Sequence, residues 1–592
     1  MTGQLNRVDV TVLPMGWMTR DPGSFPTEVS GSWSPALSPD GRHAAYVSDR
    51  SGVPKVWVQP VGSELTFLVD TGEAPVMAVQ WSTGGGWLAC QVAPGGAPRH
   101  EVWLVRPDGS ELHQVAGFGS DTADNMRWLP GRSLLAVTEN LTRALVIDPV
   151  TGERREILSE ELISLFDVSP DFSRALIRRG SRGARHIAVR CLETGAEEYV
   201  TSGEEAVFGP DGSIWARSDA GEFPVLIRVA DTGEVTVVAG SDTAEVESFA
   251  LTADGRRVAV LWNVRGGTSR ISLFPDNSEV PVPGLVASGP SWSTDGNTLT
   301  FTAEGPGQPH GTWVFTDGGL SPVSVEPRSD RAVVPTLEEF PAHDGTALTG
   351  WLFRPAGDEP HPVVLWFHGG PEAQERPGHG ALFQSLVDRG IAVFAANVRG
   401  SSGFGRTFVN ADNGPLRYDA IRDVESCVRH LVDTGVADPA RVGVMGRSYG
   451  GYLTLAALVT YPDLFAVGID VCGMSNFATF YEHTEPWIAA AAVSKYGDPV
   501  TDADLLRDLS PMTRIDRLRT PLMVVHGEND SNVPVIEAEQ VVDALRSRGI
   551  EHKYLLFRDE GHELLHRHSR AEYLQETVAW LTHHLRTAVP TV

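Results

Sequence analysis

A phrase that recurs through the first half of the chain constrains the fold more than any other feature. Each copy starts at an aromatic residue, passes a polar turn often written Ser-Pro-Asp-Gly, and ends in an alternating apolar strand. Successive copies lie roughly forty residues apart, the interval at which four short strands form one β-propeller blade. Seven copies can be read, around Trp33–Gly41, Trp81–Trp87, Trp128–Leu135, Phe166–Asp171, Phe208–Gly212, Phe249–Gly255 and Trp292–Gly296.

Asp-Gly suits these turns because glycine accepts positive φ at little cost and aspartate bonds the neighbouring backbone. A β-sandwich could use the same strands, but nothing in a sandwich requires a repeat of blade length. The repeat therefore predicts a seven-bladed propeller over residues 31–327. Residues 1–30 form a separate N-terminal segment that could pack on the second domain. A propeller alone would be a scaffold or a partner-binding surface.

The second half has a different period, which begins after residues 328–337. Short apolar runs such as Val363–Phe367, Val442–Met445 and Leu522–Val525 alternate with amphipathic stretches such as Asp419–Asp433. Continuous apolar runs are typical of parallel strands covered on both faces. The pattern predicts a doubly wound, mostly parallel sheet of the α/β-hydrolase type over residues 328–592.

The motif Gly446-Arg-Ser448-Tyr-Gly450 lies between one of these strands and a helical run. A serine on a sharp strand-to-helix turn needs small neighbours, and its hydroxyl then stands clear of the sheet. GxSxG alone is a weak signal, but this placement makes it a strong one. We predict Ser448 as a nucleophile.

A serine hydroxyl needs a base that an acid orients, and in this fold the acid precedes the histidine along the chain. Asp530 follows a buried strand, and His562 follows the strand at Tyr554–Phe557. Both lie in loops at strand ends, where catalytic groups of such sheets gather. We prefer Asp530 to Asp498 or Asp559 because it follows the strong strand; the alternative role for Asp530 is capping its own loop.

An oxyanion formed in acyl transfer needs two preorganised donors, commonly backbone N–H groups. One is expected from Tyr449, directly after the nucleophile. The other is expected from the turn His368-Gly369-Gly370-Pro371, with Gly370 as the donor. The alternative is that these glycines only close a loop.

A competing metal motif overlaps the predicted histidine. His562-Glu-Leu-Leu-His566 spells HExxH, which on a helix can hold zinc. The reading requires a helix through His562, whereas Asp559–Gly561 just upstream indicates a loop. It also needs a third ligand, such as Glu572 or Glu576, and leaves Ser448 unexplained. We therefore expect no metal and no other cofactor.

Composition narrows the classes of partner. The formal charge of −28 disfavours nucleic acid and anionic membranes, because phosphate groups would be repelled. No apolar stretch reaches the roughly 18 residues of a membrane span, and the start lacks a basic leader. The four cysteines form no CxxC pair or dense framework. The sequence predicts a soluble cytoplasmic protein and leaves a homo-oligomer open.

Taken together, these motifs resemble the prolyl oligopeptidase family of serine peptidases, over nearly the whole chain. The resemblance rests on the propeller, on the order of the hydrolase residues, and on the segments His368–Pro371, Asn397–Gly405 and Gly446–Gly451. Within the family the chain looks most like the acylaminoacyl-peptidase and dipeptidyl-peptidase branch. The resemblance implies triad roles for Ser448, Asp530 and His562, and oxyanion roles for Gly370 and Tyr449.

One position departs from the family pattern. Relatives often carry an arginine two residues after the catalytic aspartate, where it holds a substrate carbonyl, and here that residue is Asn532. An amide donates a hydrogen bond but not a charged fork. Aromatic residues that could line an acyl-side pocket follow the strand ending near Cys472, although such clusters are more often core: Phe477, Phe480, Tyr481 and Trp487.

The sequence thus predicts a serine hydrolase that cleaves short peptides or peptide-like amides, with the propeller as a gate. An esterase or a drug-amide hydrolase with the same triad is the alternative, and a non-catalytic propeller binding protein is a third. A dipeptidyl aminopeptidase would need carboxylates for a free amino terminus. Glu204 and Glu205 are the adjacent pair in question, but the preceding Ser-Gly indicates a solvated turn.

Overall fold

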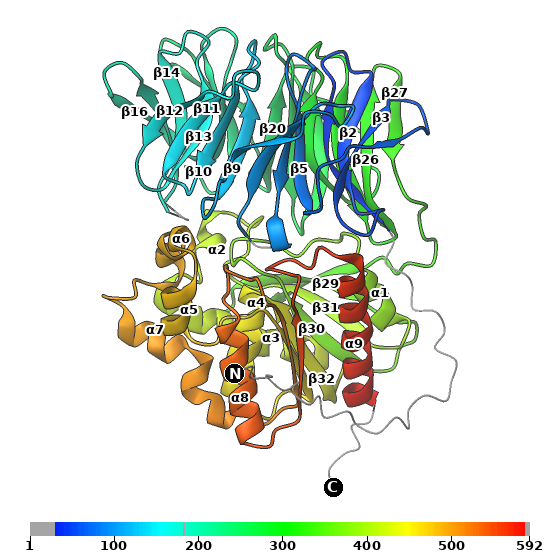
Figure 1. Ribbon diagram of the computed structural model, residues 1–592. Helices are drawn as coiled ribbons and strands as arrows, with labels where there is room; N and C mark the ends of the chain where they lie inside the picture. Colours follow the sequence, from blue (N-terminus) through cyan, green and yellow to red (C-terminus); the bar gives the residue numbers. More distant parts are fainter. Residues whose placement is uncertain (1–29, 97, 182–183, 587–592) are drawn as a thin grey trace, which may run out of the picture.

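The computed structural model describes residues 30–96, 98–181 and 184–586, which form two bodies stacked on each other (Figure 1). The upper body is a β-propeller of small antiparallel sheets, and the lower is an α/β-hydrolase domain. Apart from Ser30, the predicted N-terminal segment 1–30 lies outside the described residues. None of the helices in the described part of the chain is long and apolar enough to cross a membrane.

The propeller consists of five four-stranded sheets and one seven-stranded sheet, in which β16 pairs with both β15 and β17. Its strands are β1 (Ser32–Leu37), β2 (His43–Ser48), β3 (Lys55–Pro60), β4 (Phe67–Leu68), β5 (Val76–Trp81), β6 (Leu88–Val92), β7 (Glu101–Val105), β8 (His113–Ala116), β9 (Ala123–Trp128), β10 (Leu135–Glu139), β11 (Arg143–Ile147), β12 (Arg154–Ser159), β13 (Ile163–Val168), β14 (Arg174–Arg179), β15 (His186–Cys191), β16 (Glu197–Phe208), β17 (Ile214–Ser218), β18 (Val225–Val229), β19 (Val235–Ala239), β20 (Ala244–Leu251), β21 (Val258–Val264), β22 (Thr268–Phe274), β23 (Ser278–Val280), β24 (Val286–Trp292), β25 (Leu299–Gly305), β26 (Gln308–Thr316) and β27 (Gly319–Ser324).

The first and last sheets close the ring by side-chain contacts. Ser32 Oγ donates to Ser324 O at 2.6 Å, and Gln59 Nε2 donates to Val323 O at 2.7 Å. Buried apolar residues from the two sheets, among them Tyr46 and Val314, pack together beside these bonds. Within residues 30–327 that the structure describes, the ring is therefore closed without a strand exchanged between its first and last sheets.

One mixed sheet runs through the lower body in the order β28-β29-β31-β30-β32-β33-β34-β35. Pairing is antiparallel from β28 to β31 and parallel from β31 to β35. The predicted parallel strands are present, and the antiparallel edge was not anticipated. The strands are β28 (Thr336–Pro341), β29 (Ala347–Phe353), β30 (His361–Phe367), β31 (Ala392–Asn397), β32 (Ala437–Arg447), β33 (Val467–Val471), β34 (Leu522–Gly527) and β35 (His552–Phe557).

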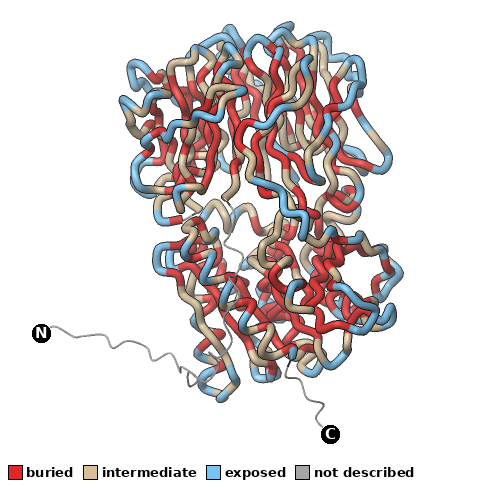
Figure 2. The backbone as a smooth tube through the Cα atoms, turned by 90° about the vertical axis from the view of Figure 1, so that its right-hand side faces the viewer, coloured by how far each residue is buried: buried red, intermediate tan, exposed pale blue. Residues whose placement is uncertain are grey.

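Helices cover both faces of this sheet, as a doubly wound fold requires. One apolar core lies under α3, α4 and α8, and the other lies under α1 and α9. Figure 2 shows buried residues running through both bodies of the molecule. The helices are η1 (Pro94–Gly96), α1 (Ala381–Val387), α2 (Arg406–Val409), η2 (Gly414–Leu416), α3 (Arg417–Asp433), α4 (Tyr449–Thr460), α5 (Phe477–His483), α6 (Pro486–Tyr496), α7 (Ala503–Leu509), η3 (Pro511–Arg517), α8 (Ile536–Ser547) and α9 (Arg567–Arg586).

Candidate active site

Ser448 occupies the single-residue turn between β32 and α4. Its backbone has φ 56° and ψ −117°, a conformation that non-glycine residues rarely adopt. A Cβ on Gly446 would lie 2.3 Å from Gly450 O, and one on Gly450 would lie 1.9 Å from Phe367 O. The two flanking glycines are therefore required by close backbone packing. This strained turn presents Ser448 at the carboxyl edge of the sheet.

Asp530 and His562 meet in the loops that follow β34 and β35. His562 Nδ1 and Asp530 Oδ2 are 2.7 Å apart, and Asp530 is 4% exposed. Asp530 Oδ1 accepts hydrogen bonds from the backbone N–H groups of Asn532 and Val533, both at 2.9 Å. The carboxylate thus caps its own loop and also orients the imidazole, so the two roles that the sequence left as alternatives coexist.

Electrostatics favours the charged form of both partners. Burial alone would lower the pKa of His562, but the charge of Asp530 and its hydrogen bond, with a contribution from the neighbouring Cys472, raise it above its ordinary value. Burial alone would raise the pKa of Asp530, yet the charge and hydrogen bond of His562 hold it below its ordinary value. Asp530 is therefore ionised at neutral pH and stabilises positive charge on the imidazole.

Two contacts bring the Ser448 turn to His562. The N–H of Ser448 donates to Val471 O at 2.8 Å, and the next residue, Cys472, contacts the His562 ring. Arg447 Nη2 donates to the backbone carbonyl of His562. Among the hydrogen bonds of the described residues there is none between Ser448 Oγ and the ring. Catalytic hydrogen bonds commonly tighten only when substrate binds.

The predicted oxyanion donors flank Ser448. Tyr449 is the first residue of α4, where N–H groups have no partner within the helix. In the loop after β30, a Cβ on Gly369 would lie 3.3 Å from Ser448 Cβ. Gly370, the predicted donor, has φ 122° and follows directly. The loop thus passes beside the nucleophile, and the choice of Gly370 over Gly369 remains a prediction.

His368 anchors that loop as a neutral side chain. Its ring lies 2.8 Å from Ser401 Oγ and 2.7 Å from Gly369 O. Burial lowers the pKa of His368 to about 4, so the ring is uncharged at neutral pH. The motif histidine therefore supports the loop rather than titrating with the site.

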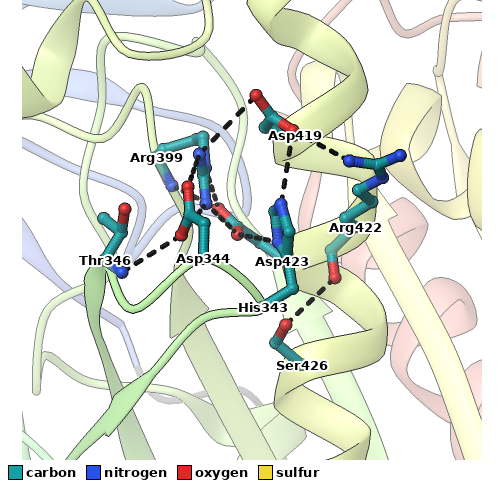
Figure 3. A network of polar contacts seen from close by, with 8 residues as sticks. All are labelled: His343, Asp344, Thr346, Arg399, Asp419, Arg422, Asp423 and Ser426. Atoms are coloured by element: carbon teal, nitrogen blue, oxygen red, sulfur yellow. Dashed lines mark hydrogen bonds and ion pairs between the residues drawn. The ribbon is translucent and has the colours of Figure 1, made fainter.

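A second polar network fixes the loop that carries Ser401. Arg399 is 4% exposed and makes two 2.8 Å bonds to Asp423 of α3, while its Nη1 lies 3.0 Å from Asp344 (Figure 3). His343 and Asp419 complete the cluster. Arg399 thereby ties the end of β31 to α3 and, through Ser401, supports His368.

Buried charges behind the oxyanion donors escaped the sequence analysis. Tyr449 Oη donates to Asp412 Oδ2 at 3.1 Å, and the fully buried Arg417 pairs with the same carboxylate. Arg417 Nη2 also donates to Lys495 O at 2.9 Å. Lys495 Nζ lies 2.7 Å from Glu372 Oε1, directly after the His368–Pro371 turn. One network therefore joins the two sides of the predicted oxyanion site.

Glu560 is another residue that the sequence analysis missed. Its carboxylate is fully buried and accepts the N–H groups of Leu565 and His566, both at 2.9 Å. These bonds hold the segment after His562 in a non-helical conformation, because α9 begins only at Arg567. The structure therefore lacks the helix through His562 that the zinc alternative required.

The predicted substrate-binding side chains lie mostly in the core. Phe477 and Phe480 are 1% and 2% exposed and pack in the core under α3 and α4. Tyr481 Oη donates to Gly497 O at 2.9 Å, and Trp487 is partly buried. Asn532 directs its backbone N–H to Asp530. Burial of the two phenylalanines fits the core alternative, and a substrate role for the set remains a prediction.

The prediction of a solvated turn at Glu204 and Glu205 was wrong. Both residues lie inside β16, which continues through Gly203. A Cβ on Gly203 would lie 2.2 Å from Arg217 O, so this glycine permits close strand approach rather than a turn. Burial, partly offset by nearby arginines, raises the pKa of Glu205 to about 7.

Glu204 belongs to a cavity between the two bodies. Its Oε2 accepts hydrogen bonds from Arg178 at 2.9 Å and from Arg185 at 3.0 Å. The cavity has a volume of about 530 Å³, and Arg185 and Asp219 of the propeller line it together with Glu372 of the hydrolase domain. Since Glu372 directly follows the loop beside Ser448, the cavity approaches the candidate site from the propeller side.

The propeller also contacts the loops that hold Asp530 and His562. Asn529 Nδ2 donates to Gly95 O at 3.2 Å, and a Cβ on Gly96 would lie 2.8 Å from Gly561 N. Figure 1 shows η1 projecting from the propeller toward the hydrolase domain at this point. The propeller therefore covers the edge of the sheet at which the candidate site lies.

An α/β-hydrolase fold with a serine on this strained turn defines a serine hydrolase. Residues 379–588 match the model of the prolyl oligopeptidase family. The match lies within the hydrolase domain, which is thus similar to the domain of this family, and the chain is a serine peptidase or a related serine hydrolase.

Relatives of known name extend the match. Dipeptidyl aminopeptidase BIII of Pseudoxanthomonas mexicana is 28% identical over 590 residues, covering 89% of this chain and 83% of the relative. The acylamino-acid-releasing enzyme of Arabidopsis thaliana is 29% identical over 211 residues, which cover 34% of this chain and 28% of the relative. A crystal structure of puromycin hydrolase shares the fold with a TM-score of 0.83 at 18% identity, covering 96% of each chain.

Proposed function

We propose that Ser448, His562 and Asp530 are the catalytic triad of this peptidase. The observation that carries the proposal is the 2.7 Å bond between His562 and the buried Asp530, beside the strained turn of Ser448. Ser448 Oγ attacks the substrate carbonyl while His562 takes its proton and then passes it to the leaving amine. Asp530 keeps the ring in the required tautomer and stabilises its charge. Water then hydrolyses the acyl-enzyme.

The developing oxyanion is stabilised by the N–H of Tyr449 and an N–H of the turn after β30, for which we choose Gly370. The buried network behind them is proposed to fix their spacing. Tyr449 is held by Asp412 and Arg417 on one side, and Glu372 is held by Lys495 on the other. Preorganised donors of this kind cost no reorganisation during the reaction.

The domain division follows the repeat. We propose a propeller over residues 31–327 and a catalytic domain over residues 328–592. In the propeller, the seven-stranded sheet counts as two blades that share β16, which gives seven blades with the five four-stranded sheets. The pairing of β16 supports this reading, because residues 197–202 pair with β15 and residues 203–208 pair with β17.

The substrate class proposed is short peptides and peptide-like amides. The propeller covers the candidate site and contacts the loops of Asp530 and His562, so a bound chain must fit between the two bodies. A folded protein is excluded by this arrangement, whereas a short peptide can enter by domain opening. An esterase or a small-molecule amide hydrolase with the same triad is the alternative.

The proposal also concerns the amino terminus of the substrate, which can be free or blocked. A site that binds the ammonium group of a free amino terminus needs a carboxylate that is not already paired with a cationic side chain. Glu204 already accepts bonds from Arg178 and Arg185, so its charge is compensated. We therefore expect blocked or acylated amino termini to be hydrolysed at least as well as free ones.

A reporter panel tests this function. One cleavable bond is placed in free, acetylated and internal contexts, in a series from dipeptide to long unfolded chain, with simple esters alongside. We expect rates to fall with chain length and acetylated peptides to be cleaved. Level rates across the length series would contradict the gate, and a strict need for a free amine would contradict the substrate assignment. Ser448→Ala in each assay identifies background hydrolysis.

A further inference from the structure

Cys472 lies against the candidate triad although the proposed reaction does not use it. It follows β33 directly, has φ 43° and is 3% exposed. Its N–H donates to Val525 O at 2.8 Å, which ties it to the strand that leads to Asp530. Its thiol lies beside the ring of His562. A ligand atom from each of Cys472, Asp530 and His562 lies within 4.8 Å of the other two.

Sulfur, imidazole nitrogen and carboxylate oxygen together are a donor set for zinc and related thiophilic cations. A thiolate and a carboxylate supply two negative charges, which neutralise a dication in a site where Asp530 and Cys472 are buried. The nearby guanidinium of Arg447 is compensated by Glu563 at 2.7 Å. Local charge therefore does not oppose a bound cation.

We propose that Cys472, Asp530 and His562 form an inhibitory site for a thiophilic divalent cation such as Zn²⁺. Ligand atoms of tetrahedral zinc lie about 3.5 Å apart. Side-chain rotations would have to lengthen the 2.7 Å contact between His562 and Asp530 and bring the thiol of Cys472 to the ion. Binding releases the thiol proton and one proton of the charged imidazole to solvent, because both groups must be deprotonated to serve as ligands. The ion occupies the base and its orienting carboxylate, so Ser448 cannot transfer its proton and turnover stops. The proposed inhibition depends on the proposed function of the triad, whereas the proposed binding of the cation does not.

Cobalt absorbance tests binding without any assay of hydrolysis. Co²⁺ added to the full chain should produce a thiolate-to-cobalt charge-transfer band, which Zn²⁺ then removes. Cys472→Ser should lose the band, with Cys472→Ala as a second variant if the first does not fold. Cys191→Ser is the matched control, because Cys191 is the more exposed thiol. A band that survives in Cys472→Ser and disappears in Cys191→Ser would overturn the site.

A second cluster and the HExxH histidine provide further controls. Glu551, His583 and His584 also place ligand atoms within 4.8 Å of one another, but at the surface. His584→Gln and His566→Gln should leave the cobalt band in place. Loss of the band in either variant would assign cation binding elsewhere.

Zinc inhibition of reporter hydrolysis then tests the consequence of binding. Each variant is normalised to its own rate without metal. Cys472→Ser should need at least about tenfold more Zn²⁺ for half-inhibition, since loss of a ligand weakens a site by at least as much as loss of its outer support. Full inhibition of Cys472→Ser at the concentration that inhibits the unaltered chain would overturn the proposal. If the unaltered chain hydrolyses no reporter, the proposed function fails while the cobalt result still decides the site.

Discussion

The aspartates of the propeller turns and two buried aspartates at the active site have opposite surroundings. In the propeller turns, Asp40, Asp254 and Asp295 each accept a hydroxyl bond of 2.6 Å from a serine or threonine two residues earlier. In the hydrolase domain, Asp412 and Asp530 are 0% and 4% exposed and pair with residues from other elements. A short local pattern therefore specifies the propeller turns. The two aspartates of the hydrolase domain depend instead on burial and on a partner outside their own loop, five residues away for Asp412 and 32 residues away for Asp530.

The two kinds of aspartate also carry different electrostatic costs. Bonds from Ser293 and Asn297 hold the pKa of the exposed Asp295 below its ordinary value. Burial raises the pKa of Asp412 despite Arg417, so its charge depends on that partner. Removing the partner of an aspartate should thus lower the free energy of unfolding little for a propeller turn and much for a buried aspartate of the hydrolase domain.

The largest effect is expected for Asp530→Asn. Loss of the orienting carboxylate should lower kcat/KM by about 10⁴-fold, because the imidazole loses its tautomer and its stabilised charge. The charge of Asp530 raises the pKa of His562, so its loss lowers that pKa. Activity needs the neutral ring and rises with pH through this pKa. The acid limb of the residual kcat/KM profile should therefore move to lower pH.

Asp559→Asn is the matched control for that experiment. Asp559 is exposed and lies in the same loop as His562. Its replacement should leave both the rate and the acid limb unchanged. A loss with Asp559→Asn comparable to that with Asp530→Asn would remove the distinction between the buried and the exposed aspartate.

Arg417→Met should have the next largest effect, this time on stability. It leaves the buried carboxyl group of Asp412 without its partner, which costs about 3–5 kcal/mol in the free energy of unfolding. Arg228→Met breaks a 2.6 Å pair with Asp211 at the propeller surface and should cost about 0–1 kcal/mol. Urea unfolding of both variants gives the comparison.

Two results would contradict this interpretation of the buried pair. Equal losses in the free energy of unfolding for Arg417→Met and Arg228→Met would show that burial does not make one ion pair more important for stability than the other. The double variant Asp412→Leu/Arg417→Met should recover part of the stability, since both charges are removed together. If the double variant is less stable than Arg417→Met, the two side chains stabilise the fold mainly through packing and not through their charges.

Local features of the molecule could be predicted from the sequence, whereas contacts between distant residues could not. The repeat and the apolar runs located the propeller and the parallel strands, because both are local patterns. Ser448, Asp530 and His562 could be named from motif and chain order. The partnership of Arg417 with Lys495 joins residues 78 positions apart and has no motif. The role of Gly203 could not be predicted, because the sequence does not distinguish a glycine that permits close approach of two strands from a glycine in a turn.

A small effect on stability, and none on activity, is expected for Asp295→Ala. The buried hydroxyl of Ser293 loses its acceptor, which should cost about 1 kcal/mol in the free energy of unfolding. The turn lies in the propeller and has no contact with the triad loops in the described structure. Hydrolysis of a short peptide reporter should therefore be unchanged. A changed kcat/KM would show that this turn is coupled to the active site.

Covalent labelling of Ser448 tests the central claim most directly. A phosphonate or sulfonyl fluoride reagent should modify the chain once, with complete loss of activity, and mass spectrometry of its peptides should place the modification on Ser448. Ser448→Ala should remain folded, take up no label and hydrolyse no reporter. Labelling at another residue, or hydrolysis that persists in Ser448→Ala, would contradict the account.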